Sequence, residues 1–493
     1  MKLNAKQIAH FCGGTFVVEP IDSAELAHGI TWDSRDVKPG DVYVAIPGER
    51  VDGHSFVAAA IRAGAVCALI MSPLDEATLT FAREMGAAII EVPNTSAAVV
   101  DLARGWRPYI KGRVVGVTGS VGKTTTKNFI RDVLASRYSV VATRGNQNNE
   151  LGAPRTILNV DPTTEYAVVE MGMQELGEIA FLCGFVRPDW GVISCVGESH
   201  IEFRGSRENI ARAKSELFAA LPGGGMAFVN AADDFAGFVC KNAQLERRHV
   251  RVSAFDGSGT CEDPEALAPL TGIEADGHVA AWATDVTLND EGCPRFILHV
   301  LRPGLVEEVP CELVLRGLHN VSNACAAAAV GAAAGIDAET IARALAASVP
   351  EAGRQEIIRA RAGWTIVNDA YNASPESMRA SLMTFAASAC KGKRYAVLGD
   401  MGELGDFAIP GHESVGRLLA TLPIDFTICI GELASHIADA AIAAGANPEA
   451  VVKVQAISEV LGELDIRLAP DDSVLVKASH FMGLTRVVEG LRA

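Results

Sequence analysis

A glycine-rich turn in the first third of the chain constrains the fold more than any other feature. The turn reads Gly116-Val-Thr-Gly-Ser-Val-Gly-Lys-Thr-Thr-Thr126 and follows an apolar, β-branched run at residues 113–117. A helical pattern comes directly after it. Gly119 and Gly122 carry no side chains, so backbone N–H groups can surround an anion where the helix begins. The pattern therefore predicts a buried strand, a phosphate-binding loop and a helix in succession.

Two side chains of this turn suit the phosphates of a nucleotide. Lys123 is placed to reach the β- and γ-phosphates, and the hydroxyl of Thr124 is placed to face Mg²⁺. The strict P-loop pattern has glycine at position 117, where this chain has Val117. We predict that the phosphate-binding residues are Gly119, Ser120, Val121, Gly122, Lys123, Thr124 and Thr125.

Length and composition limit the class of protein. At 493 residues the chain is too long for one core, and about 150 residues per domain predicts three domains. Hydrophobic residues make up 49% and charged residues 21%, as in soluble globular proteins. The net charge of -17 argues against non-specific binding to nucleic acid or to anionic membranes. We expect neither nucleic acid nor stable membrane insertion, and we expect a monomer.

Cysteine usage and the apolar segments indicate the compartment. Eleven cysteines occur without a C-x-x-C pair, which favours reduced thiols over disulfides. Residues 1–10 lack the apolar core of a signal peptide and predict a short amphipathic helix. Residues 317–336 are uncharged apart from one histidine, but they are rich in alanine and contain asparagines, so they predict a buried soluble helix. A cytoplasmic protein is expected.

Hydrophobic periodicity divides the chain into three α/β segments. Residues 1–110 predict strands at 41–46 and 66–71 and a helix at 55–63. Residues 111–348 begin with the phosphate loop and alternate strand with helix, except for a small antiparallel annex at 255–310. Residues 349–493 predict a doubly wound sheet. Its strands are expected at 365–369, 395–399, 426–431, 451–454 and 473–476.

Charged residues at strand ends are the next candidates. Glu170 ends a buried strand predicted at 166–170, the position where a nucleotide-binding sheet often holds an acid near Mg²⁺. Asp369, Asp400 and Lys477 also lie at predicted strand ends, where ligands of doubly wound sheets gather. An acid at such a position can instead cap a helix, and the pattern leaves that alternative open.

With these motifs placed, the sequence resembles the ATP-dependent Mur ligases of peptidoglycan synthesis over nearly its whole length. The family writes its phosphate loop as G-x-x-G-K-T, which matches Gly119 to Thr124 here. Further matches follow in the family's order. They are Asp33-Ser34-Arg35, Asp52-Gly53-His54, residues 146–152, Glu170-Met-Gly172, His200, residues 213–216, residues 317–323, residues 368–373 and residues 397–405.

Two motifs distinguish members of this family. Asp369-Ala-Tyr-Asn372 and Leu398-Gly-Asp-Met-Gly-Glu-Leu-Gly405 are similar to those of the member that adds D-alanyl-D-alanine. The D-N-P-R signature of the member that adds the third amino acid is absent from the sequence. Near the C-terminus, Lys477-Ala-Ser-His480 stands where the family usually has Lys-Gly-Ser-Arg, so the contact made by that arginine is in question at His480.

The resemblance implies a small α/β N-terminal domain (1–110) for a UDP-sugar-peptide, a central P-loop-type mononucleotide-binding domain (111–348), and a Rossmann-like C-terminal domain (349–493) that closes on ATP and binds the incoming dipeptide. Closure is expected about a hinge near residues 350–353. The implied reaction joins UDP-MurNAc-tripeptide to D-Ala-D-Ala through an acyl phosphate, and uses ATP and Mg²⁺.

The resemblance also implies roles for single residues. Lys123, Lys214 and His200 would be catalytic. One Mg²⁺ would lie at Thr124 and Glu170, and a second at His200 and at Lys214, the latter as a carbamate. His319, Asn320, Asn323, Arg354 and Asp369 would complete the ATP site. The peptide substrate would contact Ser34, Arg35, Asp52, Gly53, His54 and Asn149.

Alternatives remain open at this stage. Lys214 can be a surface lysine paired with Glu216 or Glu208, and His319 can merely cap a helix. A related amide ligase that adds the third amino acid, or glutamate to folate, would share most of the motifs. A protein of another class, which senses a nucleotide without ligation, would need the phosphate loop alone.

Overall fold

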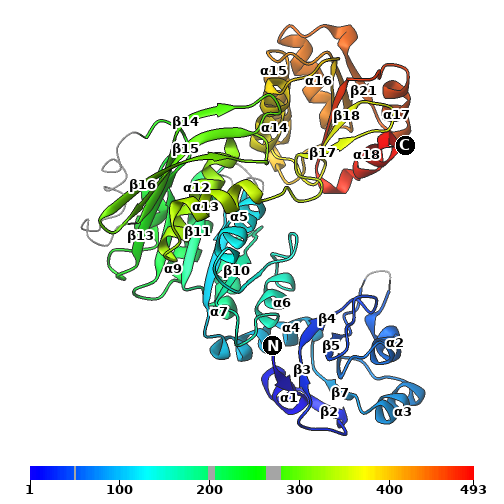
Figure 1. Ribbon diagram of the computed structural model, residues 1–493. Helices are drawn as coiled ribbons and strands as arrows, with labels where there is room; N and C mark the ends of the chain where they lie inside the picture. The colour runs from blue at the N-terminus through cyan, green and yellow to red at the C-terminus, as the bar shows by residue number, and fades with distance from the viewer. Residues whose placement is uncertain (49–50, 198–205, 262–278, 493) are drawn as a thin grey trace.

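The computed structural model describes residues 1–48, 51–197, 206–261 and 279–492. Three bodies follow one another along the chain, each built on its own sheet (Figure 1). All eleven cysteines are free, as the composition predicts. Within the described ranges, every helix is too short or too polar to cross a membrane.

The N-terminal body contains a five-stranded sheet in the order β2-β7-β6-β5-β4, with β2 antiparallel to β7 and the other strands parallel. The predicted strands at 41–46 and 66–71 are β5 and β6, and the helix predicted at 55–63 is split into η1 and α2. The elements are β1 (Leu3–Asn4), α1 (Ala5–Cys12), β2 (Thr15–Val18), β3 (Leu26–Ala27), β4 (Gly29–Thr31), β5 (Asp41–Val44), η1 (Gly53–Phe56), α2 (Val57–Arg62), β6 (Cys67–Ile70), α3 (Glu76–Met85), β7 (Ala88–Glu91), α4 (Thr95–Trp106) and η2 (Arg107–Tyr109).

The central body is a nine-stranded sheet in the order β16-β15-β14-β13-β12-β11-β8-β10-β9. The antiparallel annex predicted at 255–310 is confirmed in β14, β15 and β16, which pair antiparallel and extend the central sheet through a parallel pairing of β14 with β13. The elements are β8 (Arg113–Thr118), α5 (Lys123–Ala135), β9 (Val140–Ala142), α6 (Gly152–Leu158), β10 (Tyr166–Glu170), α7 (Glu178–Val186), β11 (Trp190–Ile193), α9 (Arg207–Ala219), β12 (Met226–Asn230), α10 (Ala236–Asn242), β13 (Arg251–Asp256), β14 (Ala280–Leu288), β15 (Pro294–Arg302), β16 (Leu305–Glu312), α12 (His319–Ala333) and α13 (Ala338–Ala347).

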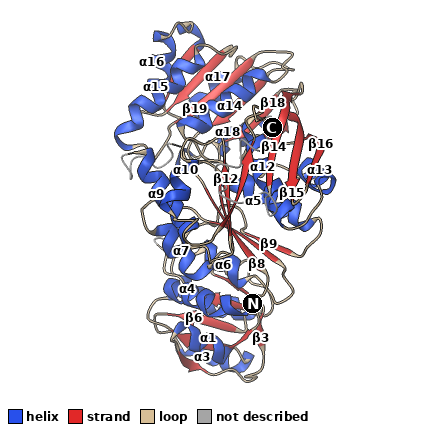
Figure 2. Ribbon diagram, turned by 90° about the vertical axis from the view of Figure 1, so that its left-hand side faces the viewer, coloured by secondary structure: helices blue, strands red, loops and turns tan. Residues whose placement is uncertain are grey.

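Helices cover both faces of the central sheet (Figure 2). One core joins α5, α12 and α13 to one face, and α12 is the buried alanine-rich helix predicted from residues 317–336. The other face packs on α6, α7 and α9, and its core continues through α4 into the N-terminal body. The opposite faces follow from alternation along β8, where Val115 and Val117 face the first core and Val114 the second.

The C-terminal body is a six-stranded sheet in the order β17-β18-β22-β19-β20-β21, parallel except for β17. Helices α14 to α16 pack on one face and α17 and α18 on the other, which confirms the doubly wound prediction. The elements are β17 (Glu356–Arg359), β18 (Thr365–Asp369), α14 (Pro375–Ala387), β19 (Arg394–Gly399), η5 (Gly405–Phe407), α15 (Ala408–Leu419), β20 (Phe426–Ile430), α16 (Ala434–Ala443), η6 (Pro448–Ala450), β21 (Val451–Val454), α17 (Ile457–Asp465), β22 (Ser473–Lys477), η7 (His480–Met482) and α18 (Thr485–Arg492).

Candidate active site

The phosphate loop joins β8 to α5 as the sequence predicts. Gly122 caps α5 with a left-handed backbone, φ 79°, which a residue with a side chain adopts only with strain. A Cβ atom at this position would lie 2.5 Å from Oδ1 of Asn323, so the turn also leaves no room for one. Lys123 is folded back onto the loop, and its Nζ donates to the carbonyls of Gly119 at 2.8 Å and Ser120 at 3.1 Å. Burial lowers the pKa of Lys123.

The residues that follow β11 hydrogen-bond to the phosphate loop. The N–H of Ser120 donates to the carbonyl of Cys195 at 2.9 Å, and the Ser120 hydroxyl accepts from the N–H of Gly197 at 2.8 Å. Ser194 donates its hydroxyl to the carbonyl of Val121 at 2.6 Å. These hydrogen bonds hold the loop in one conformation, as preorganised anion binding requires.

A buried acid lies beside the loop. Glu170, at the end of β10, is 1% exposed, and its Oε1 accepts from the Thr124 hydroxyl at 3.1 Å and from Asn148 Nδ2 at 2.9 Å. Its other oxygen, Oε2, is buried without a hydrogen-bond partner, and Lys127 Nζ lies 3.8 Å away. An unsatisfied carboxylate oxygen next to a hydroxyl fits an oxygen-ligated Mg²⁺. Among the described residues, no three His, Cys, Asp or Glu side chains form a metal cluster, and His200 lies outside those residues.

The asparagines at the start of α12 are already engaged with the protein. Asn323 accepts from the Thr126 hydroxyl at 3.0 Å and donates to Asn320 at 2.9 Å, and Asn320 donates to the carbonyl of Arg316 at 2.7 Å. These hydrogen bonds connect the start of α12 to α5. Hydrogen bonding to adenine remains a prediction, which has to be met by the donors and acceptors that these contacts leave over.

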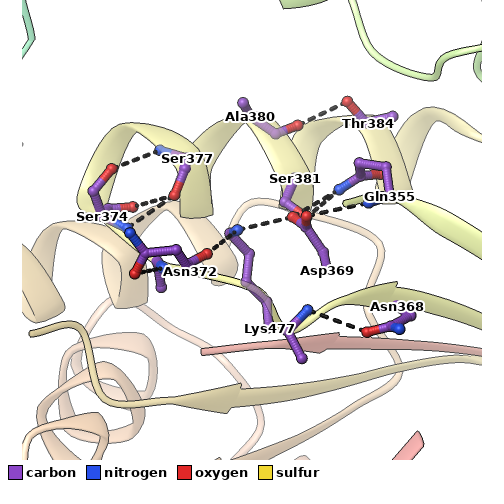
Figure 3. Close-up of polar contacts among 12 residues, drawn as sticks. Gln355, Asn368, Asp369, Asn372, Ser374, Ser377, Ala380, Ser381, Thr384 and Lys477 are labelled. Carbon is purple, nitrogen blue, oxygen red and sulfur yellow. Dashed lines mark hydrogen bonds and ion pairs between the residues drawn. The ribbon is translucent and has the colours of Figure 1, made fainter. Parts of the chain in front are cut away.

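The C-terminal body supplies a charged wall of the site, in which Asp369 and Lys477 point toward one another (Figure 3). Asp369 Oδ2 pairs with Lys477 Nζ at 2.8 Å and accepts from Gln355 Nε2 at 3.0 Å, and both charged side chains are largely buried. His319, the first residue of α12, is exposed in the same space, where the charges of Asp369 and Lys477 act on it. Arg354 lies over the ring of Tyr371, 4.1 Å from its centroid. The two bodies thus place cations and the acids Glu170 and Asp369 around a common space.

That space is a cleft of about 1260 Å³ between the central and C-terminal bodies. It brings together the predicted residues Ser120, Val121, Gly122, Lys123, Thr124, Thr125, Asn149, Glu170, His319, Asn320, Asn323, Arg354, Asp369 and His480. Tyr371 and His480 stand together in its wall, with ring centroids 5.9 Å apart.

Lys214 lies on α9, outside the lining of this cleft. It is 1% exposed, so the alternative that it is a surface lysine is wrong. Burial raises the pKa of Cys195, which lines the cleft, and the positive charge of Lys214 opposes this increase. Glu208 pairs with Arg212 on the surface, and Glu216 accepts from backbone N–H groups at the start of α7. Carbamate formation at Lys214 stays a prediction.

The predicted residues of the N-terminal body lie outside the cleft lining. His54 is buried, donates from Nδ1 to Asp52 at 2.6 Å, and accepts at Nε2 from the N–H groups of Met71 and Ser72. Gly53 approaches Ile46 so closely that a Cβ would clash with the backbone. These contacts give the Asp52-Gly-His54 motif a structural role in shaping its loop.

Ser34 and Arg35 lie on an exposed loop. Arg35 pairs with Asp33 at 2.6 Å, and that hydrogen bond lowers the pKa of Asp33 to about 2. The surface position keeps both residues accessible, and substrate contact by Ser34, Arg35, Asp52, Gly53 and His54 remains a prediction.

One strand-end acid has a structural role, and several cleft residues were missed by sequence reasoning. Asp400 accepts from the N–H of Ala434 at 2.7 Å and so caps α16, the alternative left open above. Lys127, Gln355 and Tyr371 contribute to the site or its support but were not singled out. The available signal for Lys127 was its position one turn after Lys123, which places both on one face of α5.

Comparisons with known proteins agree with this arrangement. Residues 26–107 match the Mur ligase family catalytic domain, residues 117–331 the Mur ligase middle domain, and residues 353–480 the Mur ligase glutamate ligase domain. A relative from Bacillus subtilis, named UDP-N-acetylmuramoyl-tripeptide–D-alanyl-D-alanine ligase, is 33% identical over 100% of this chain and 98% of its own.

Solved structures give the same result. A crystal structure of MurF from Acinetobacter baumannii has a TM-score of 0.80 at 28% identity and covers 100% of this chain and 99% of that one. A MurF ligase from Thermotoga maritima in complex with ADP has a TM-score of 0.72 at 28% identity and covers 94% and 97%. With a phosphate loop, a buried acid and a second body facing them, and with matches over all three bodies, this chain belongs to the Mur ligase family.

Proposed function

We propose that the protein is an ATP-dependent ligase that joins D-alanyl-D-alanine to UDP-N-acetylmuramoyl-tripeptide in peptidoglycan synthesis. The observation that carries this proposal is the cleft in which Lys123, Glu170 and Asp369 converge from two bodies. We propose these substrates because relatives that align over the whole chain, such as the Bacillus subtilis ligase, are named for them. ATP as the nucleotide is supported by the ADP complex of the Thermotoga maritima structure.

The chemistry follows from the charge of the reactants. A carboxylate has no good leaving group, so its oxygen first attacks the γ-phosphorus of ATP. This step expels ADP and forms an acyl phosphate. The amine of the dipeptide then attacks the acyl carbon, loses a proton and expels phosphate. Both reactants of the first step are anions, so cations must surround them. Lys123 supplies one positive charge at the loop and Arg354 another from the opposite wall.

Thr124 and Glu170 would hold a Mg²⁺ ion, which when bound would neutralise part of the negative charge of the nucleotide phosphates. The hydrogen bond between them fixes the hydroxyl and the carboxylate on one side of the loop. When a nucleotide enters, Lys123 exchanges two backbone carbonyls for phosphate oxygens, which are stronger acceptors because they are charged. We infer that His200 and Lys214 support a second ion and that His319, Asn320 and Asn323 contact the adenosine.

The division of labour follows the three bodies. We propose boundaries at residues 110/111 and 348/349, with the UDP-sugar-peptide on the first body and Asn149, and the dipeptide on the third. Asn128 of α5 donates to Glu351 at 3.4 Å, and Ser348 donates to Asp132 at 2.7 Å, so both residues tie the linker to α5, and we propose that it bends near residues 350–353 on closure. We propose a monomer acting in the cytoplasm, a compartment in which free thiols such as those of the eleven cysteines persist.

The test is ADP release by the purified protein with Mg-ATP, UDP-MurNAc-tripeptide and D-Ala-D-Ala, each omitted in turn. Tripeptides ending in meso-diaminopimelate and in lysine are tried separately. We expect release that requires both the tripeptide and the dipeptide. Turnover with a diamino acid and the shorter precursor would assign the neighbouring ligase instead, and nucleotide binding without turnover on any acceptor would favour a nucleotide sensor.

A further inference from the structure

Lys127 is a buried cation that the proposed chemistry does not use. It lies on α5, one turn after Lys123, and is 1% exposed. A buried ammonium group is costly unless its protons are hydrogen-bonded and its charge is compensated. Burial lowers the pKa of Lys127, and the negative charges of Glu170 and Glu351 oppose that effect. Because burying this charge costs free energy, we expect Lys127 to have a function, which its contacts indicate.

Its hydrogen bonds cross from the helix to a neighbouring loop. Nζ donates to the carbonyl of Thr143 at 2.8 Å and to that of Gly145 at 2.9 Å. These residues begin the segment between β9 and α6 that carries Asn148 and Asn149 into the cleft. Lys127 therefore anchors this segment to the helix that bears the phosphate loop.

The same segment closes a ring of contacts around Glu170. The N–H of Glu170 donates to the Thr143 hydroxyl at 3.0 Å, and Asn148 Nδ2 donates to its Oε1 at 2.9 Å. Lys127 Nζ stands 3.8 Å from Oε2, too far for a hydrogen bond but close enough for strong attraction in a buried site. Oε1 is thus fixed by neutral donors, while Oε2 is held by charge alone and stays available as a ligand.

We propose that Lys127 is a positioning residue that anchors the 143–149 segment and holds the Glu170 carboxylate in place with Oε2 available to Mg²⁺. The inference rests on the proposed Mg²⁺-nucleotide site. The two lysines of α5 would then have different roles. Lys123 binds phosphate, and Lys127 positions the metal ligand Glu170 before the nucleotide binds. Removal of Lys127 should then weaken the contribution of Mg²⁺ to nucleotide binding, more than it weakens binding of the nucleotide itself.

Three variants test this. Lys127→Met removes the charge and the donors, and Lys127→Gln removes the charge but keeps an N–H donor for the carbonyls. Arg107→Met is the matched control, because Arg107 is also a buried cation that donates to backbone carbonyls, those of Val186 and Arg187, but it lies outside the cleft. Thermal unfolding of each variant reports its structural cost.

The readout is ADP affinity measured by titration calorimetry with and without Mg²⁺. The gain is the ratio of ADP affinities with and without Mg²⁺. For Lys127→Met we expect this gain to fall at least about tenfold, which corresponds to loss of roughly one good charged interaction. The ADP affinity without Mg²⁺ should change less than about threefold. Lys127→Gln should lose most of the same gain while melting closer to the parent protein. Arg107→Met should lower the melting temperature and leave the gain intact.

Two results would overturn the proposal. Equal losses with and without Mg²⁺ would make Lys127 a purely structural residue, and a larger Mg²⁺ gain in Lys127→Met would show that its charge repels the ion. If Lys127→Met does not fold, Lys127→Gln decides between the same outcomes. The proposed ligase function fails separately, through absence of dipeptide-dependent ADP release in the parent protein, which these ADP titrations do not measure.

Discussion

Gly122 offers a prediction in which strain and steric clash can be separated. Gly122→Ala places a methyl group on a left-handed residue, which costs about 1–2 kcal/mol. The methyl carbon would also stand 2.5 Å from Asn323 Oδ1 and force that amide to move. Asn323 would then lose its hydrogen bonds to Thr126 and Asn320, each worth about 1 kcal/mol. We expect a total loss of about 3–4 kcal/mol in the free energy of unfolding.

Gly177→Ala is the matched control. Gly177 caps α7 with a left-handed backbone, φ 92°, and a Cβ there would meet nothing within 4 Å. It should cost only the strain of about 1–2 kcal/mol. The two variants therefore differ by the clash with Asn323, which amounts to about 2 kcal/mol.

Urea unfolding followed by tryptophan fluorescence measures the stability of both variants, and Mg-ADP titration measures the site. Because Asn323 lines the cleft, we expect Gly122→Ala to weaken Mg-ADP binding by about tenfold or more and Gly177→Ala to leave it unchanged. Equal destabilisation by the two substitutions, or unchanged ADP affinity in Gly122→Ala, would refute the reasoning.

Three further predictions concern charge. Lys123→Ala should reduce ADP release by about a hundredfold or more, since one stabilising cation at the phosphates is lost, and near-normal turnover would remove Lys123 from the mechanism. Lys477→Met should destabilise the C-terminal body by about 3–5 kcal/mol, because it leaves buried Asp369 uncompensated. In thermal melts the surface variant Lys453→Met should change little, and equal effects would contradict the burial argument. Burial lowers the pKa of His412 in the native protein. Below about pH 6.5 this histidine is therefore protonated in the unfolded chain while it is still neutral in the native protein. Stability should therefore fall with decreasing pH, at most about 1.4 kcal/mol per unit, and His412→Gln should flatten that slope in acid titrations of stability; an unchanged slope would exclude His412 as its source.

Patterns within a few residues predicted much of the fold. Strands β10, β18 and β21 have the predicted bounds, and the phosphate loop lies where its glycines and Lys123 place it. These features depend on local rules, namely alternation along a strand and the backbone freedom of glycine in a turn. The family resemblance rests on the same local motifs, taken in order along the whole chain.

Burial and long-range contacts were decided by the tertiary structure. Sequence spacing left Lys214 as either a surface lysine or a functional one, and only packing against the sheet buries it. Asp400 and Asp369 have the same strand-end pattern, yet one caps α16 and the other pairs with Lys477 in the cleft. A strand end specifies where an acid lies along its strand, but the order of strands determines which neighbours it meets.

The sequence by itself thus determined the α/β class, the phosphate loop and the family of this protein. Only the tertiary structure brought Thr126 against Asn323, 197 positions apart, and placed the Glu170 oxygen that lacks a hydrogen bond beside Lys127. The physical reason is that local conformation depends on neighbouring residues along the chain. The charge and hydrogen bonding of a buried site depend on which distant segments the packed sheets bring together.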